Sequence, residues 1–136
     1  MTTATAQKEK KTIMITDDNE AILDVMTLML EDAGYAVKTT VDGNDLRNMQ
    51  EPLPDLLFLD ILLSGEDGAE LCKSLKANSK TKHIPVIMLS ANGSLEKIAK
   101  DCGAEGILAK PFSMKDMLAL VEQHTTSQPI TPPRYE

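Results

Sequence analysis

The feature that most constrains the fold of this chain is a fivefold alternation of short apolar segments with longer amphipathic segments. The apolar segments predict strands at 12–16, 35–40, 55–60, 85–89 and 106–109. The amphipathic segments predict helices from 17–19 to just before Gly34, and at 43–50, 68–78, 94–102 and 113–124. Repeated alternation of this kind predicts one α/β domain, a doubly wound parallel sheet of five strands with five helices on its two faces.

The segment 55–60 (DLLFLD) is the most uniformly apolar run of the chain. A strand in the middle of a parallel sheet is covered on both faces, so it shows no polar alternation. We therefore expect this strand at the centre of the sheet. Ligands of such sheets bind outside the carboxyl ends of the strands, so residues that end or follow a strand are the first candidates for a site.

Two polar segments flank the alternating region. Residues 1–11 predict a disordered leader, and the proline-rich residues 125–136 predict a disordered tail or a truncated linker. The folded domain is expected to span 12–124. The net charge of the chain is −7, the leader contributes +2 and the tail none, so the remainder carries about −9. This balance argues against direct binding of nucleic acid by a basic face.

No apolar run approaches the ~20 residues that span a membrane, and no signal-peptide pattern follows Met1. We expect a cytoplasmic protein without membrane insertion. The two cysteines, Cys72 and Cys102, lack a CxxC pattern and fall on the apolar sides of helical repeats. They are expected to be buried thiols that pack as small apolar groups.

Polar residues stand at the carboxyl ends of four predicted strands. Asp17 and Asp18 follow the first strand, Asp60 ends the third, Ser90 follows the fourth and Lys110 follows the fifth. Each has an ordinary structural explanation when taken singly, such as a helix cap, a turn or a solvated charge. Together they should meet at one edge of the sheet, and this convergence favours a functional site.

Electrostatics indicates what such a site would bind. Two carboxylates ~4 Å apart repel by ~4 kcal/mol at an effective dielectric constant of about 20, so three of them need a cation. Oxygen ligands of this type suit Mg²⁺, a hard ion that keeps waters and often bridges to phosphate. With the amine of Lys110 and the hydroxyl of Ser90, the set is typical of phosphoryl transfer onto a carboxylate, here Asp60.

The chain resembles the receiver domains of bacterial two-component response regulators over about residues 12–124. The resemblance is carried by ITDDNE, DLLFLDILLSGEDG, VIMLSA and GAEGILAKPF in this order. It implies a flavodoxin-like sheet with strand order 2-1-3-4-5. It also implies a phosphoacceptor signalling domain, with self-catalysed phosphoryl transfer and slow autodephosphorylation, and not an enzyme that acts on other substrates.

The resemblance implies a metal site that contains Mg²⁺, with Mn²⁺ as a possible substitute. Asp18, Asp60 and the backbone carbonyl of Leu62 would hold the ion, and Asp17 would act through water. Asp60 would accept the phosphoryl group from a phosphohistidine.

Three further residues would serve the phosphorylated state. Ser90 would move to hydrogen-bond one phosphoryl oxygen, and Lys110 would pair with another. Pro111 would follow a cis peptide bond.

The chain departs from the family pattern at several positions near the site. Ile107 stands where the family usually has an aromatic residue, so we expect the signal to leave through shifts near 90–101 instead of a coupled serine–aromatic switch. Ser64 replaces the usual proline and predicts a more mobile loop. Leu62 and Asn92 flank the acceptor at variable positions, where Leu62 should obstruct water and Asn92 could orient it.

The leading hypothesis is a stand-alone phosphorylation switch without its own output domain. A sensor histidine kinase or histidine phosphotransferase would dock on the first helix around 19–26. An effector protein would read the fourth helix, fifth strand and fifth helix. The protein would be a monomer or a weak, phosphorylation-dependent dimer.

Two alternatives remain open. The chain could be the receiver fragment of a longer DNA-binding regulator or hybrid histidine kinase. It could also be a flavin-binding or phosphatase relative with the same sheet. The sequence DDNEA after the first strand argues against the flavin-binding and the phosphatase relative. It is neither the Ser/Thr/Gly-rich phosphate loop of the first nor the DxD motif of the second.

Overall fold

The five apolar segments form one parallel sheet in the computed structural model, which describes residues 10–63, 65–91 and 96–125. The strands are β1 (Thr12–Thr16), β2 (Ala36–Thr40), β3 (Leu56–Asp60), β6 (Val86–Ser90) and β7 (Gly106–Ala109). Their spatial order is β2-β1-β3-β6-β7. Counted within this sheet alone, that is the order 2-1-3-4-5, so the predicted flavodoxin-like fold with its central third strand is confirmed.

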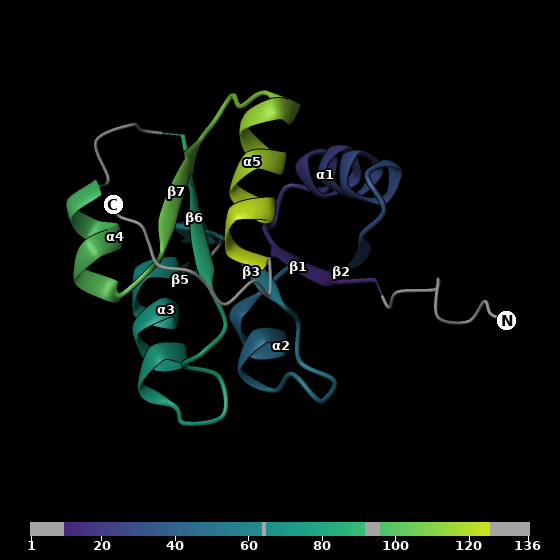
Figure 1. Cartoon of the computed structure of the whole chain (residues 1–136). Coiled ribbons are helices and arrows are strands. Elements are labelled where there is room, and N and C mark those ends of the chain that lie inside the picture. The colour runs from purple at the N-terminus through teal and green to yellow at the C-terminus, as the bar shows by residue number, and fades with distance from the viewer. Residues whose placement is uncertain (1–9, 64, 92–95, 126–136) are drawn as a thin grey trace, which may run out of the picture.

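Five helices cover the two faces of the sheet (Figure 1). They are α1 (Glu20–Asp32), α2 (Gly43–Arg47), α3 (Gly68–Ala77), α4 (Glu96–Cys102) and α5 (Met114–Thr125). Helices α1 and α5 lie on one face, and α2, α3 and α4 lie on the other. None of the helices in the described ranges is long and apolar enough to span a membrane.

The central strand β3 divides the core in two. Leu57 and Leu59 pack on the side of α2, α3 and α4, whereas Leu56 and Phe58 pack on the side of α1 and α5. All five residues of β3 are buried. Because successive side chains of a strand point to opposite faces, a strand covered on both sides must be apolar at every position except its functional end, Asp60.

One helix end departs from the sequence prediction, and one helix start that was predicted only as 17–19 is now assigned. Helix α2 ends at Arg47, not near Gln50, because Asn48 leaves the helical conformation and its side-chain amide donates to the carbonyl oxygen of Asn44 (2.9 Å). The N-cap of α1 is Asn19, whose side chain accepts from two backbone amides, so neither aspartate before it serves as the cap. The predicted helix start at Ser94 and most of the predicted leader and tail lie outside the described residues.

One element was not predicted. Between β3 and α3 the chain makes a short antiparallel hairpin of β4 (Leu62–Leu63) and β5 (Glu66–Asp67). Leu62 pairs with Asp67, and Leu63 pairs with Glu66. This hairpin begins two residues after the end of the central strand, so it borders the predicted site. Ser64 lies outside the described residues.

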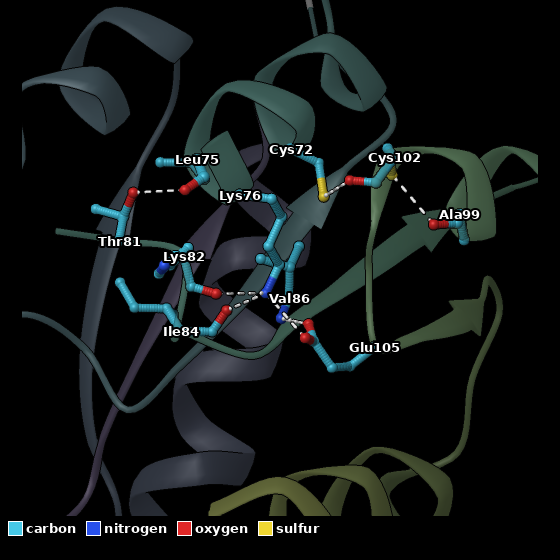
Figure 2. Close-up of polar contacts among 10 residues, drawn as sticks. All are labelled: Cys72, Leu75, Lys76, Thr81, Lys82, Ile84, Val86, Ala99, Cys102 and Glu105. Atoms are coloured by element: carbon cyan, nitrogen blue, oxygen red, sulfur yellow. Dashed lines mark hydrogen bonds and ion pairs between the residues drawn. The ribbon is translucent and has the colours of Figure 1, made fainter. Parts of the chain in front are cut away.

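The two cysteines lie where α3 meets α4, as Figure 2 shows. Both are free and buried, which confirms the prediction. The thiol of Cys72 donates to the carbonyl oxygen of Cys102 (3.4 Å), and the thiol of Cys102 donates to that of Ala99 (3.3 Å). Burial raises the pKa of the Cys72 thiol, so these groups act as packing residues.

Lys76 of α3 ties together the connections at the amino ends of β6 and β7 (Figure 2). Its ammonium donates to the carbonyl oxygens of Lys82 (3.3 Å) and Ile84 (2.7 Å) and pairs with Glu105 (2.9 Å). Glu105 also accepts from the backbone amide of Val86 (2.7 Å). The network lies at the edge of the sheet opposite the carboxyl ends, so it anchors the fold away from the predicted site.

Replacing Lys76 with methionine should lower the free energy of unfolding by about 2–3 kcal/mol, because hydrogen bonds to a charged group are each worth about 1.5–3 kcal/mol and Glu105 would lose its cation. Lys73→Met is a matched control on the same helix, since its pair with Glu70 is exposed and long (3.5 Å), and it should cost about 0.5 kcal/mol or less. Urea denaturation measures both. Equal losses for the two variants would contradict the anchoring role.

Candidate functional site

The site lies at the carboxyl edge of the sheet and begins with three aspartates. Asp17 directly follows β1 and is fully buried, Asp18 beside it is exposed, and Asp60 ends β3 with 7% of its surface exposed. One carboxylate oxygen from each lies within 4.8 Å of the others. Parallel neighbouring strands end at the same edge, which is why residues 43 positions apart in the sequence meet here.

A cation completes this cluster. The ammonium of Lys110, the residue after β7, lies 2.9 Å from Asp17 Oδ2 and 3.8 Å from Asp60 Oδ2. Its backbone amide donates to the carbonyl oxygen of Ser90 (2.7 Å), which joins the end of β7 to the end of β6. The Lys110–Pro111 peptide bond is cis. The side chain of Ser90 is buried at the same edge.

Backbone groups orient two of the carboxylates. The amide of Leu62 donates to Asp60 Oδ1 (3.2 Å), and the amide of Asn19 donates to Asp17 Oδ1 (2.9 Å). Glycine at position 68 lets the start of α3 pack directly on the end of β3, since a Cβ there would lie 2.2 Å from the carbonyl oxygen of Asp60. The sequence reasoning missed Gly68, although a glycine immediately after the helix cap Asp67 was a usable signal.

The pKa of the Asp60 carboxyl is raised above its ordinary value. Burial is the main cause, and the negative charges of Asp17 and Asp18 act in the same direction. The amide of Leu62 and the ammonium of Lys110 oppose them by favouring the ionised form. The site therefore holds the ionised carboxylate of Asp60 at a cost in stability, which a bound cation would relieve.

Replacing Asp60 with asparagine removes a buried charge that lies beside two other carboxylates. The free energy of unfolding of the metal-free protein near pH 7 should rise by about 0.5–2 kcal/mol, the size of a typical stabilising substitution. An acid whose pKa is raised on folding favours the folded state below its unfolded pKa, and this contribution is lost as the pH rises through the folded pKa. The free energy of unfolding of the wild type should thus drop below that of D60N above about pH 4. Urea denaturation in EDTA, repeated from acidic to neutral pH, tests this. If the free energies of unfolding of the two proteins change with pH in the same way, the prediction is contradicted.

Two of the remaining predicted positions, Leu62 and Ile107, lie within the described residues. Leu62 has 75% of its surface exposed at the mouth of the site. Ile107 in β7 is half-buried and packs with the core on the side of α3 and α4, as a strand residue does. Asn92 lies outside the described residues. A groove of about 840 Å³ runs from Asp60 and Lys110 outward between α3 and α4.

The donor set fits a magnesium ion. Three carboxylates supply hard oxygen ligands, one of them exposed and two buried. The acidic cluster, the buried serine and the lysine lie together at the carboxyl edge of a doubly wound sheet, where such folds bind their ligands.

Comparison with known proteins identifies the family of this chain. Residues 13–122 match the family model of the response regulator receiver domain, and the chain therefore belongs to this family. It is 41% identical over 112 residues to the DNA-binding dual master transcriptional regulator RpaA of Synechocystis, a match that covers 80% of this chain and 46% of the relative. The chain thus spans less than half the length of that regulator.

Solved structures show the same fold. A putative response regulator from Chloroflexus aurantiacus superposes with a TM-score of 0.81 at 32% identity, over 86% of this chain and 98% of that one. The receiver domain of sensor histidine kinase PA1611 from Pseudomonas aeruginosa superposes with a TM-score of 0.77 at 24% identity, over 86% and 98%. That domain holds a magnesium ion in its active-site cleft. At this identity the likeness itself shows the fold alone.

Proposed function

We propose that this chain is a phosphorylation switch in which Asp60 accepts a phosphoryl group from a phosphohistidine of a sensor histidine kinase or histidine phosphotransferase. A carboxylate oxygen of Asp60 forms the new P–O bond while the P–N bond to the donor imidazole breaks. The observation that carries the proposal is the cluster of Asp17, Asp18 and Asp60, with the ammonium of Lys110 beside Asp17 and Asp60. Such transfer depends on positioning and charge neutralisation more than on covalent chemistry.

The chain's own residues divide these tasks. Asp18, Asp60 and the backbone carbonyl of Leu62 would hold Mg²⁺, or Mn²⁺ in its place, with Asp17 acting through water. When bound, the ion neutralises negative charge on the phosphoryl oxygens. Lys110 pairs with one phosphoryl oxygen.

The buried hydroxyl of Ser90 donates to another phosphoryl oxygen once the side chain turns toward it. The exposed side chain of Leu62 at the mouth of the site hinders attack of water on the acyl phosphate, so autodephosphorylation is slow. Asn92, two positions after the last residue of β6 in the sequence, acts in the opposite direction by orienting that water.

Two faces serve partners. The donor protein docks on α1 beside the site, where Val25 and Leu28 expose 45% and 69% of their surface. An effector protein reads α4, β7 and α5. With Ile107 in place of an aromatic residue, the signal leaves through the segment from the end of β6 through α4. The phosphoryl group adds a charge of about −1.5 to −2, and this charge shifts the conformation of the face that the effector reads.

The role as the receiver of a longer DNA-binding regulator is the second candidate, because the matched relative RpaA is such a regulator and is more than twice as long as the matched region. The native reading frame distinguishes it from a stand-alone switch. A stop codon directly after Glu136 would exclude the longer protein.

Incubation with Mg²⁺ and a small-molecule acyl phosphate tests the acceptor. Intact-mass analysis should show one adduct of about 80 Da, the mass of one phosphoryl group, in the wild type and none in D60N. EDTA should abolish the adduct because the carboxylate cluster then lacks its cation. An adduct that persists in D60N would refute the assignment of Asp60.

A further inference from the structure

The hairpin after the acceptor connects Asp60 to α3, and its geometry governs the backbone around Leu62. Strand β5 returns antiparallel to β4, so Glu66 lies opposite Leu63. At its base the amide of Gly68 donates to the carbonyl oxygen of Ile61 (2.9 Å). The base is therefore closed by backbone bonds, whereas the outer part is a pair of two-residue strands. Strands this short hold little structure by themselves.

A side-chain contact ties the outer part of the hairpin to α2. The guanidinium of Arg47 donates to Glu66 Oε2 and forms an ion pair with it. The same carboxylate occupies the space beside Gly43, the first residue of α2, where a Cβ would lie only 2.0 Å from Glu66 Oε1. The Glu66 carboxylate thus packs in a space that exists because residue 43 has no side chain. We call Gly43, Arg47 and Glu66 the hairpin latch.

The latch is too exposed to matter much for global stability. The side chain of Arg47 is 50% exposed and that of Glu66 28%, and ion pairs of this kind contribute about 0–1 kcal/mol. Its effect is local, because the backbone of Leu62 sits on the strand that β5 holds. The Leu62 amide already donates to Asp60 Oδ1, and in the proposed function its carbonyl holds the metal.

We propose that Glu66, held by Arg47 over Gly43, is a positioning residue for the metal and phosphoryl site. It holds the β4–β5 hairpin against α2 and so keeps the Leu62 backbone aligned with Asp60 before the metal binds. This inference rests on the proposed function in one respect, the assignment of the Leu62 carbonyl as a metal ligand. Partners outside the ligand shell commonly tune metal affinity by orienting the ligands.

The first test is the affinity of the metal-free protein for Mg²⁺. It is measured by titrating Mg²⁺ and recording the shifts of backbone amide NMR signals. Glu66→Gln and Arg47→Ala should each weaken binding about fivefold, somewhat less than the 10–100-fold typical of residues that contact a ligand directly. The double variant should be no weaker than either single variant, because one contact is lost in all three. Hydrogen exchange of the Leu62 amide should quicken in the same variants without metal.

Gly43 supplies an independent test. Gly43→Ala should weaken Mg²⁺ binding in the wild type, because the new methyl group displaces the Glu66 carboxylate. The same substitution added to Glu66→Ala should change the affinity little, since the space is then open. Glu70→Gln is the matched control: it breaks an exposed ion pair on α3 and should leave both the affinity and the Leu62 exchange rate unchanged.

The outcomes separate this inference from the proposed function. If the wild type binds no Mg²⁺ and forms no adduct on Asp60, the proposed function fails. If the wild type does both, and Glu66→Gln and Arg47→Ala match the Glu70→Gln control in affinity and exchange, the latch has no positioning role. Urea denaturation identifies any variant that has lost its fold. If Glu66→Gln or Arg47→Ala is such a variant, the effect of Gly43→Ala on Mg²⁺ affinity decides whether the latch has a positioning role.

Discussion

Replacing Lys110 with methionine should slow phosphorylation of Asp60 by about 100- to 1000-fold, the loss found when one preorganised group that stabilises transition-state charge is removed. The ammonium lies 3.8 Å from Asp60 and 2.9 Å from the fully buried Asp17. In the proposed function it would pair with a phosphoryl oxygen on Asp60. Its ion pair with Asp17 already holds the ammonium in place, so little reorganisation would be needed. The rate of adduct formation with a small-molecule acyl phosphate, followed by intact mass, measures the effect.

The same substitution should also change the pH dependence. The ammonium of Lys110 is one of the groups that lowers the pKa of Asp60, so its loss raises that pKa further. Because the ionised carboxylate is the nucleophile, the half-maximal rate should move to higher pH. A profile that keeps its midpoint in Lys110→Met would contradict the electrostatic role.

Without Lys110, Asp17 is a buried carboxylate that has lost its cation. Removing one partner of a buried pair commonly costs about 3–5 kcal/mol, so the metal-free variant should unfold at lower temperature. Added Mg²⁺ should stabilise the variant more than the wild type. Lys115→Met, an exposed lysine of α5, is the control and should leave rate, pH profile and stability close to those of the wild type.

Replacing Gly68 with alanine should reduce adduct formation by about 100-fold, since a shift near 1 Å in a reacting group can cost that much. The added Cβ would lie 2.2 Å from the Asp60 carbonyl oxygen and 2.7 Å from Ile61 Cα. Both are backbone atoms of the acceptor strand and the hairpin base. They cannot rotate away, so relief requires that Asp60 or the start of α3 move.

Gly106→Ala is the matched control for this glycine. Its Cβ would meet Ile87 Cδ1 at 3.2 Å, the end of a side chain that can adjust. Both variants should lose stability, Gly68→Ala by about 1–3 kcal/mol as in overpacked cores. Only Gly68→Ala should lose the adduct and Mg²⁺ affinity together; retention of both would mean that Asp60 tolerates the displacement.

The site illustrates which features local sequence can predict. Asp17, Asp60 and Lys110 were predicted to meet because each stands at the carboxyl end of a strand, and parallel strands bring those ends to one edge. The start of α1 was predicted only as 17–19, because Asp17, Asp18 and Asn19 are all good capping residues. The structure assigns the cap to Asn19.

The hairpin shows what local sequence does not predict. Strands of two residues carry no measurable periodicity, so β4 and β5 could not be recognised. The pairing of Glu66 with Arg47, 19 residues earlier, depends on where α2 packs. The short extent of α2 was also missed, because Asn48 ends it by a side-chain bond and not by a glycine or proline.

By itself the sequence determined the order of strands and helices, the fully apolar central strand and the chemical set at the strand ends. These follow from periodicity and residue type, which are local properties. Only the tertiary structure decided the distances among the carboxylates, the packing of Glu66 against Gly43 and the contact of Gly68 with Asp60. Those depend on segments distant along the chain packing within an ångström or two, and short-range patterns hold no information about such distances.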